Sequence, residues 1–288
     1  MTGAGTRRLA VVGWPVEHSL SPALHGAAAR ELGLDWDYGR CAVPPDGLRS
    51  FVDALGPEWL GLSVTAPHKD DAAAIADELD PLARATGTAN TLLRGHDGRL
   101  RGWSTDVGGI VRAFADAGLD DAGTGAIVGA GATAQTALLA LARMGARHVT
   151  VALRTPAKAA RLRELAAELG VTLAVQGLEA PLPGVDAAVS TLPAAADATA
   201  SFAAPPVLLL DADYARPEGS RFLGALPAGR VIDGRAMLLQ QAVLQVRIFA
   251  LGDVDAPLPD EPRVVAAMRA ALVARGTGVR ASDSLEES

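Results

Sequence analysis

Four short segments in the first part of the chain carry polar side chains that a hydrophobic core would not use. They are GWPVEHSLSPALH with Ser19 and Ser21, VTAPHK with Thr65 and Lys69, TANT with Asn90, and WSTDVGG with Asp106. The first two segments lie at predicted strand ends, and ligands of open parallel sheets bind beyond the carboxyl ends of the strands. Hydroxyls, an amide, an ammonium and a carboxylate gathered there would suit a small polyhydroxylated acid.

A glycine-rich segment in the second part of the chain has the spacing of a dinucleotide-binding loop. The run AIVGAGATAQTALLALARMG places Gly129, Gly131 and Ala134 in a GxGxxA arrangement between a β-rich run and a helical one. The first glycine permits a tight turn, the second lets backbone N–H groups approach a pyrophosphate, and the third small residue lets the helix lie close to its strand. A second strand, HVTVAL, follows at the expected distance, so we predict a dinucleotide site here.

The end of that second strand indicates which dinucleotide binds. An NAD site usually presents a carboxylate there, whereas a 2′-phosphate calls for guanidinium or ammonium groups. No carboxylate stands at this position, where the residues are Leu153, Arg154, Thr155 and Lys158. Thr155 is placed to cap the next helix with Pro156 at its first position, so the two cations would flank a helix N-terminus. We therefore predict NADP; the alternative is that both cations are ordinary surface charges.

Hydrophobic periodicity predicts an α/β protein of two domains. Short apolar runs alternate with helical stretches, the pattern of a parallel α/β sheet. We expect a substrate-binding catalytic domain over residues 1–108 and a doubly wound, Rossmann-type NADP-binding domain with six strands over 109–234. No strand follows the helices within 235–276, so they should return to the first domain, and 277–288 has the composition of a disordered tail.

Several single elements and residues are also predicted. A helix should run from Lys69 to about Leu79, and the short strands ANTLLR and RLRGWS should face each other across the turn GHDG. His68 is expected to be exposed and His25 to be a packing residue of a helix. Cys41 is expected in a strand, buried or half-buried, without a catalytic role.

Composition excludes several function classes. The 288 residues carry a net charge of −7, which argues against a protein that tracks a nucleic-acid backbone. No apolar run approaches the roughly 20 residues of a membrane helix and the first residues lack a signal-peptide stretch, so we expect a cytoplasmic protein without a membrane partner. The single cysteine excludes intramolecular disulfides and multi-cysteine metal sites, and we expect no metal.

The order of these segments resembles one known family. GWPVEHSLSP, SVTAPHK, TANTL, STD, VGAGATA, LRT, DADY and DGRAMLLQQA follow one another as in the shikimate dehydrogenase family, from about Leu9 to Gly252. The resemblance implies NADPH-dependent reduction of 3-dehydroshikimate to shikimate, on the route to chorismate and the aromatic amino acids. It also implies a two-domain fold whose last helices return to the substrate domain.

The resemblance further implies roles for single residues. Lys69 would be the proton donor or acceptor, and Asp106 its partner. The substrate would be bound by Ser19, Ser21, Thr65, Lys69, Asn90, Asp106, Tyr214 and Gln241. The NADP would be bordered by Gly129, Ala130, Gly131, Ala132, Thr133, Leu153, Arg154, Thr155, Lys158, Ala212 and Gly234. The chemistry suits these residue types, because an ammonium stabilises a developing alkoxide and then donates a proton, while a nearby carboxylate favours the charged amine.

Four positions depart from the family's pattern. Ser63 and Ser104 stand where asparagine is common, Ala132 where glycine is common, and Leu153 where asparagine precedes the arginine of the NADP motif. A serine keeps a hydroxyl but loses the two-ended hydrogen bonding of an amide, which could alter the ring position or the substrate choice. Leu153 removes one polar contact to the adenosine end.

Other interpretations stay open at this point. The chain could be a paralogue that acts on quinate or an aminoshikimate, with NAD in place of NADP, or a catalytically silent sensor of a shikimate-pathway metabolite. Ser21 and Asp106 could simply cap helices, and a lysine at a helix start is often a solvated charge. We expect a small-molecule substrate, no nucleic-acid partner, and a monomer or homodimer.

Overall fold

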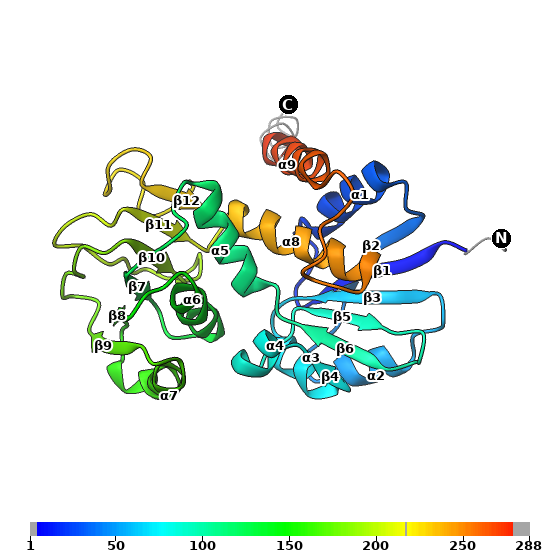
Figure 1. The fold of residues 1–288 in the computed structure, drawn as a ribbon, viewed down its shortest axis with the longest axis horizontal. Coiled ribbons are helices and arrows are strands. Elements are labelled where there is room, and N and C mark those ends of the chain that lie inside the picture. Colours follow the sequence, from blue (N-terminus) through cyan, green and yellow to red (C-terminus); the bar gives the residue numbers. More distant parts are fainter. Residues whose placement is uncertain (1–4, 217, 279–288) are drawn as a thin grey trace, which may run out of the picture. The chain divides into compact units, whose positions relative to one another are not determined.

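The computed structural model describes residues 5–216 and 218–278, which divide into two compact units (Figure 1). Unit 1 is drawn from residues 1–105 and 242–288, and unit 2 from 106–241. Helix α9 continues through Gly278, so residues 277 and 278 of the expected tail are helical, and 279–288 lie outside the described residues. Within the described ranges, no helix is long and apolar enough to cross a membrane.

Unit 1 is built on a six-stranded mixed sheet. Its strands, in the order β2-β1-β3-β5-β6-β4, are β1 (Arg7–Gly13), β2 (Trp36–Ala42), β3 (Trp59–Val64), β4 (Glu78–Leu79), β5 (Thr91–Arg94) and β6 (Leu100–Trp103). Strands β2, β1 and β3 are parallel, and the antiparallel strand β5 joins β3 to β6. The carboxyl ends of β1 and β3 therefore lie side by side, where the sequence predicted polar side chains.

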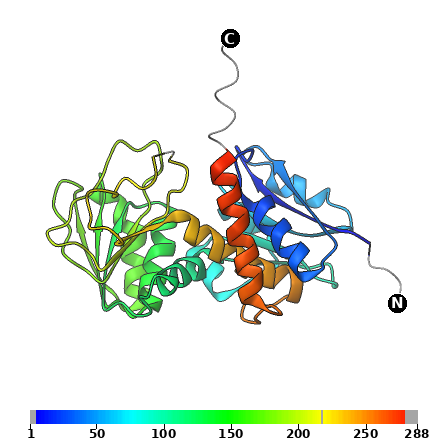
Figure 2. The ribbon, with the colours of Figure 1, turned by 90° about the horizontal axis from the view of Figure 1, so that it is seen from above.

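Alternating side chains of this sheet face two separate cores, as the period of two along a strand requires. One core contains Leu9 and Leu93 from the sheet with Ile248 and Phe249 from α8 (Gly234–Leu251). The other contains Ala10, Val12 and Leu62 with side chains of α2 (Leu48–Asp53) and α3 (Lys69–Ile75). Helix α9 (Glu261–Gly278) packs along α1 (Ser21–Leu32), as Figure 2 shows, so the prediction that the last helices return to the first domain is confirmed.

The helix expected from Lys69 to Leu79 is shorter than predicted. It ends at Ile75, and Leu79 belongs to the short strand β4. The chain is drawn into the sheet because the N–H of Asp77 donates to the carbonyl of Leu100 (2.7 Å). A helix missed by the periodicity, α4 (Pro81–Thr86), then begins; its signal was present, since Asp80 caps it ahead of a proline.

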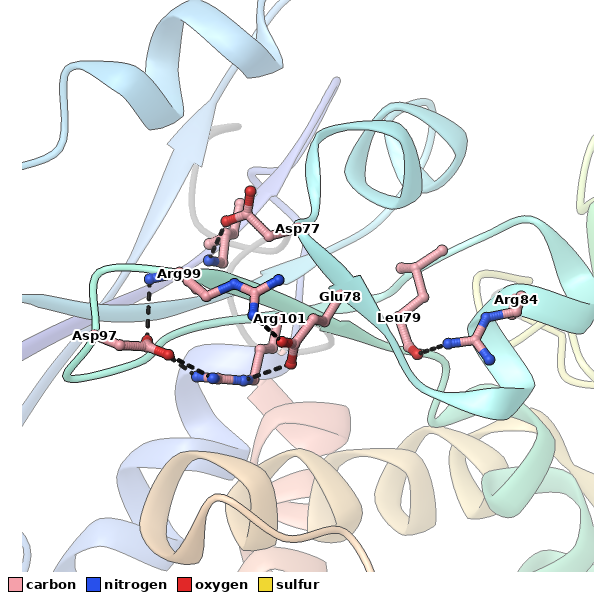
Figure 3. Close-up of polar contacts among 8 residues, drawn as sticks. Asp77, Glu78, Leu79, Arg84, Asp97, Arg99 and Arg101 are labelled. Atoms are coloured by element: carbon pink, nitrogen blue, oxygen red, sulfur yellow. Dashed lines mark hydrogen bonds and ion pairs between the residues drawn. The ribbon is translucent and has the colours of Figure 1, made fainter.

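Charged side chains gather at β4 and β6, the last two strands of the sheet (Figure 3). Arg101 donates to Asp97 (2.6 Å) and to Glu78 (2.9 Å), and Arg99 also pairs with Glu78. The hydrogen bond from Arg101, followed by that from the backbone N–H of Arg99, lowers the pKa of the Asp97 carboxyl, and the carboxylate stays charged at neutral pH. Charges along a sheet edge oppose pairing with a second chain, which suits an exposed edge.

Unit 2 is built on a six-stranded sheet whose strands are all parallel. In the order β12-β11-β10-β7-β8-β9 they are β7 (Thr124–Val128), β8 (His148–Ala152), β9 (Thr172–Gln176), β10 (Ala187–Ser190), β11 (Leu208–Asp211) and β12 (Val231–Asp233). This order reverses between β7 and β10, as in a doubly wound nucleotide-binding domain. The predicted fold class, with its Rossmann-type second domain of six strands, is confirmed.

Helices are distributed unevenly over this second sheet. Helices α5 (Asp106–Asp116) and α6 (Ala132–Arg143) pack against each other, and α7 (Ala160–Leu169) follows β8. The described residues of the last connections, 191–207 and 212–230, contain no helix and form loops instead (Figure 2). Leu192 and Phe222 from these loops fill the apolar core on their side of the sheet. The loops therefore replace the crossover helices as the cover of that face.

Candidate active site

Backbone hydrogen bonds bring the Lys69 segment beside the Asn90 segment at the strand ends of unit 1. The N–H of Thr65, just after β3, donates to the carbonyl of Val12 in β1 (2.9 Å). Lys69 opens α3 four residues later and is half-buried. Its carbonyl accepts from the N–H of Ala89 (2.9 Å), the residue before Asn90. An ammonium and an amide are thus carried by adjoining backbone segments.

The side-chain amide of Asn90 is held on both of its sides. Its Nδ2 donates to Oγ1 of Thr105 (2.9 Å), while its Oδ1 accepts from the N–H of Thr105 (2.9 Å) and from Oγ1 of Thr91 (2.9 Å). The side chain is buried. An amide bound through both ends cannot flip without breaking these bonds, so its orientation is fixed before any ligand arrives.

Gln245 on α8 connects these strand ends, and the sequence analysis missed it. Its Nε2 donates to the carbonyl of Asn90 (2.9 Å) and to Oγ1 of Thr91 (3.0 Å), and its Oε1 accepts from Oγ of Ser63 (2.9 Å). A signal was available, because Gln245 follows Gln241 by one helical turn within an otherwise apolar stretch. A buried amide there requires partners, which the sequence does not name.

The serine at position 63 is fully engaged inside unit 1. Its Oγ accepts from the hydroxyl of Tyr38 (2.7 Å) and donates to Gln245. Burial raises the pKa of Tyr38 well above its usual range, so the phenol stays protonated and acts as the donor. Ser63 therefore links the phenol of Tyr38 to the buried amide of Gln245, whereas Oγ of Ser104 is buried without a hydrogen-bond partner among the described residues.

The loop with Ser19 and Ser21 is fastened at its backbone. Arg40 donates twice to the carbonyl of Ser19 (2.6 and 3.2 Å), and Oγ of Ser19 donates to Oγ of Ser21 (3.2 Å). The expected alternative, that Ser21 caps the helix, is wrong: α1 starts at Ser21, its capping position is Leu20, and no side chain makes a capping hydrogen bond there.

His25 is a packing residue, as predicted. Its ring stacks on Tyr38 with centroids 4.2 Å apart, and its Nδ1 lies 2.9 Å from the carbonyl of Ser21, to which it donates. Burial lowers the pKa of His25 to about 4, and the ring is neutral at physiological pH. A neutral ring with its proton held by a backbone carbonyl is a poor candidate for acid–base work.

His68 is buried, and the expectation that it is exposed is wrong. Its Nε2 lies 2.7 Å from the carbonyl of Val43, and its Nδ1 lies 3.5 Å from a carboxylate oxygen of Asp71. His68 thus binds the connection after β2, and in this way it anchors the turn that carries Lys69. Cys41 lies half-buried in β2, and burial raises the pKa of its thiol, which disfavours the reactive thiolate.

The substrate residues expected from unit 2 are Asp106 at the start of α5, Tyr214 after β11, and Gln241 within α8. Asp106 is the first residue of α5 and is buried. Gly109, one turn later, lets α8 approach closely, since a Cβ there would lie 2.8 Å from Cβ of Gln241. Gln241 donates through Nε2 to the carbonyl of Leu238 (2.9 Å), and Tyr214, after β11, is 38% exposed.

The predicted dinucleotide loop has the required backbone. Gly129 has φ +118°, a conformation that favours glycine, and a Cβ there would overlap Oγ1 of Thr191. Gly131 caps α6, and a Cβ on it would meet nothing within 4 Å. Ala134 is fully buried where the helix leaves the loop. The tight turn, the open approach and the close helix packing each occur at the expected residue, with Ala130, Ala132 and Thr133 between them.

The residues after β8 separate into buried and exposed ones. Leu153 is buried and its N–H donates to the carbonyl of Gln176 (3.1 Å), while Arg154, Thr155 and Lys158 are exposed. Thr155 occupies the capping position of a short 3-10 helix, Pro156–Ala159, with the proline at its first residue as predicted, but the Thr155 side chain makes no capping hydrogen bond. Both cations nevertheless remain at the solvent side of this strand end.

Ala212 and Gly234 meet at the neighbouring strand ends. The N–H of Ala212 donates to the carbonyl of Ser190 (2.9 Å) in β10. Gly234 opens α8, and a Cβ there would lie 2.8 Å from the carbonyl oxygen of Ala212. Only glycine fits this approach without a shift of the backbone.

Comparison with known proteins accounts for both units. The model of a shikimate dehydrogenase substrate binding domain matches residues 11–92, and that of a shikimate / quinate 5-dehydrogenase matches 118–198. A shikimate dehydrogenase (NADP(+)) of Methylobacterium radiotolerans is 39% identical over 254 residues, which are 83% of this chain and 89% of that protein. The chain belongs to the shikimate dehydrogenase family. Its members are oxidoreductases, and this chain is one of them.

Solved structures of similar proteins show the range of the shikimate dehydrogenase family. The Thermus thermophilus shikimate 5-dehydrogenase in complex with NADP(H) and shikimate has a TM-score of 0.75 at 30% identity, over 92% of this chain and 99% of that one. A 5-ketofructose reductase of Gluconobacter sp. strain CHM43 has a TM-score of 0.78 at 25% identity, over 93% of this chain and 99% of that one. The fold alone therefore does not fix the substrate.

The two glycines of the dinucleotide loop should separate folding from cofactor binding. Gly129→Ala introduces strain at positive φ and should lower the free energy of unfolding by about 1–3 kcal/mol. Gly131→Ala should leave unfolding unchanged, since its Cβ meets no protein atom, but should weaken dinucleotide affinity at least about tenfold by obstructing the pyrophosphate. Urea denaturation and calorimetric titration measure the two effects. Unchanged affinity in Gly131→Ala would contradict the assignment of the loop.

Proposed function

We propose that this chain catalyses the reversible, NADPH-dependent reduction of 3-dehydroshikimate to shikimate. The observation that carries the proposal is the pre-oriented amide of Asn90 beside the segment that bears Lys69. A relative 30% identical to this chain has been solved in complex with NADP(H) and shikimate. This reaction lies on the route to chorismate and the aromatic amino acids.

The substrate is proposed to bind through hydroxyls and amides at the strand ends. The side chains are those of Ser19, Ser21, Thr65, Asn90, Tyr214 and Gln241, together with Lys69 and Asp106. A ring with hydroxyl groups and a carboxylate needs both donors and acceptors, and this set offers both. The network around Gln245 holds Asn90 in place, so less ordering is required when the substrate binds.

Lys69 is proposed as the proton donor in reduction and the acceptor in oxidation. As the ketone is reduced, its oxygen becomes an alkoxide, which the Lys69 ammonium would stabilise and then protonate. Asp106 would orient the amine and favour its charged form. Arginine could stabilise the same charge but could not readily release a proton.

NADP is the cofactor that the residues of unit 2 fit best. Gly131 leaves open space where a pyrophosphate would approach, with the N-terminus of α6 behind it. Arg154 and Lys158 are exposed after β8, in a stretch without a carboxylate, and would hold the 2′-phosphate. The cofactor would be bordered further by Gly129, Ala130, Ala132, Thr133, Leu153, Thr155, Ala212 and Gly234. When bound, NADPH supplies the hydride that reduces the ketone.

A paralogue activity on a related polyol is the second candidate, and Ser63 favours it. Where an amide would offer two-ended hydrogen bonding, the Ser63 hydroxyl is already used by Tyr38 and Gln245. The likeness to a 5-ketofructose reductase supports a family in which substrates differ. A silent metabolite sensor is less well supported, because a sensor has no need of an amine and a carboxylate paired for proton transfer, the role proposed for Lys69 and Asp106.

Steady-state assays of the purified protein separate these candidates. Shikimate and quinate should each be tested with NADP+ and with NAD+, and we expect the highest kcat/KM for shikimate with NADP+. Preference for quinate or for NAD+ would support the paralogue. Binding of shikimate without any turnover would support the sensor and contradict the proposal.

The two lysines of the chain provide a matched pair of variants. Lys69→Ala should lower kcat by at least about 10²-fold with little change in KM for shikimate, as expected for loss of a proton donor. Lys158→Ala should instead raise KM for NADP+ and leave kcat near that of the wild type at saturating cofactor. Lys158→Arg should restore binding, whereas Lys69→Arg should stay inactive. Wild-type kcat in Lys69→Ala would remove this residue from the mechanism.

A further inference from the structure

Of the two loops that replace crossover helices in unit 2, the first has little backbone hydrogen bonding within residues 192–198, where the N–H of Ala196 donates to the carbonyl of Pro193 (2.9 Å). The first follows β10, and its sequence LPAAADATA offers hardly any polar side chain that could bind its carbonyl groups. The carbonyl groups of a chain segment that follows a buried strand need hydrogen-bond donors, and here no described helix supplies them. The partner comes from the second loop, which follows β11.

Arg221 supplies these partners with a single guanidinium. Its Nη1 and Nη2 lie 2.7–3.4 Å from the carbonyl oxygens of four residues of the first loop, to which they donate: Leu192, Pro193, Ala196 and Ala198. The Arg221 side chain is 5% exposed. Arg216 adds a bond to the carbonyl of Ala194 (3.3 Å). The fork of an arginine suits such a task, since its donors are fixed in one plane.

A carboxylate anchors the same guanidinium. Oδ2 of Asp213 lies 3.7 Å from Nη2 of Arg221, and its side chain is 8% exposed. Asp213 stands between Ala212 and Tyr214, directly after β11. Arg221 therefore joins the segment after β10 to the segment after β11.

The first loop begins at the point where the strand order of the sheet reverses. Strand β10 lies beside β7, and Thr191 at its end contacts Gly129 of the dinucleotide loop. A doubly wound sheet binds a dinucleotide across this point, one mononucleotide for each half. The half with β8 carries the predicted 2′-phosphate residues, so the half with β10 and β11 is left for the nicotinamide nucleotide.

We propose that Arg221 is a positioning residue for the nicotinamide half of the cofactor, which it serves by fixing the loop of residues 192–198 against the segment after β11. The inference rests on the proposed NADP dependence. Without the guanidinium, the carbonyl groups of Leu192, Ala196 and Ala198 lose the donors described above, the carbonyl of Pro193 keeps only the N–H of Ala196, and the loop is no longer held in one arrangement.

Binding of whole and partial cofactor tests this role. Arg221→Met keeps much of the side-chain volume but removes every donor. It should weaken NADP+ binding about tenfold, or about 1.4 kcal/mol, while the affinity for adenosine 2′,5′-bisphosphate, which lacks the nicotinamide half, changes less than about twofold. Arg221→Lys should give partial rescue, because three donors serve fewer carbonyls. Arg230→Met is the matched control, since Arg230 binds the carbonyl of Val207 (2.9 Å) where the same two loops end, away from residues 192–198.

Three results would overturn the inference. Unchanged NADP+ affinity in Arg221→Met would mean that the loop does not need the guanidinium. Equal weakening of NADP+ and of the bisphosphate would indicate a general loss of structure in the unit, and Arg221→Lys provides the same comparison if the Met variant does not fold. Failure of the wild-type protein to bind NADP+ at all would instead contradict the proposed function, and this outcome is distinct from the other two.

Discussion

Buried polar groups must find hydrogen-bond partners, and this requirement shapes unit 1 around the amide of Gln245. Its two ends connect Ser63 in β3 with Asn90 and Thr91 at the start of β5. Through Ser63 the network also reaches Tyr38 in β2. Because Ser63, Asn90, Thr91 and Gln245 are buried, removing any one of these side chains leaves its neighbours unsatisfied, and the network holds a single arrangement. The side-chain amide of Asn90 is bound to this network through the hydroxyl of Thr91, so its orientation depends on that arrangement.

Unit 2 meets the same requirement with a different device. In the half with β7 and β8, the positive-φ Gly129 and the N-terminus of α6 present backbone N–H groups, as in other dinucleotide-binding loops. Its other half has loops in place of described helices, and one arginine takes up the carbonyl groups that helices would have satisfied. Both units therefore place polar groups at the carboxyl ends of their strands, and both fix them by hydrogen bonds from a distant part of the chain.

The structural features that the sequence predicts are those with a local sequence pattern. The dinucleotide loop between its strand and its helix, the second strand after it, and the Lys69 and Asn90 segments each have a signature within about twenty residues. The parts it does not predict depend on contacts between distant residues. Gln245 acts on Asn90, 155 positions away, and Arg221 acts on Leu192, 29 positions away. His68 is a further example, because its residue type alone does not indicate burial. Its ring is buried where Nε2 finds the carbonyl of Val43, which is 25 positions away.

The central claim is that this chain transfers a hydride from NADPH to a shikimate-pathway ketone. Its most direct test is to incubate the protein with 3-dehydroshikimate and NADPH that carries deuterium at the transferring position, and to examine the product by mass spectrometry and NMR. The account predicts shikimate with one deuterium on the carbon that bore the ketone. Product without deuterium, or no product from 3-dehydroshikimate, would contradict it.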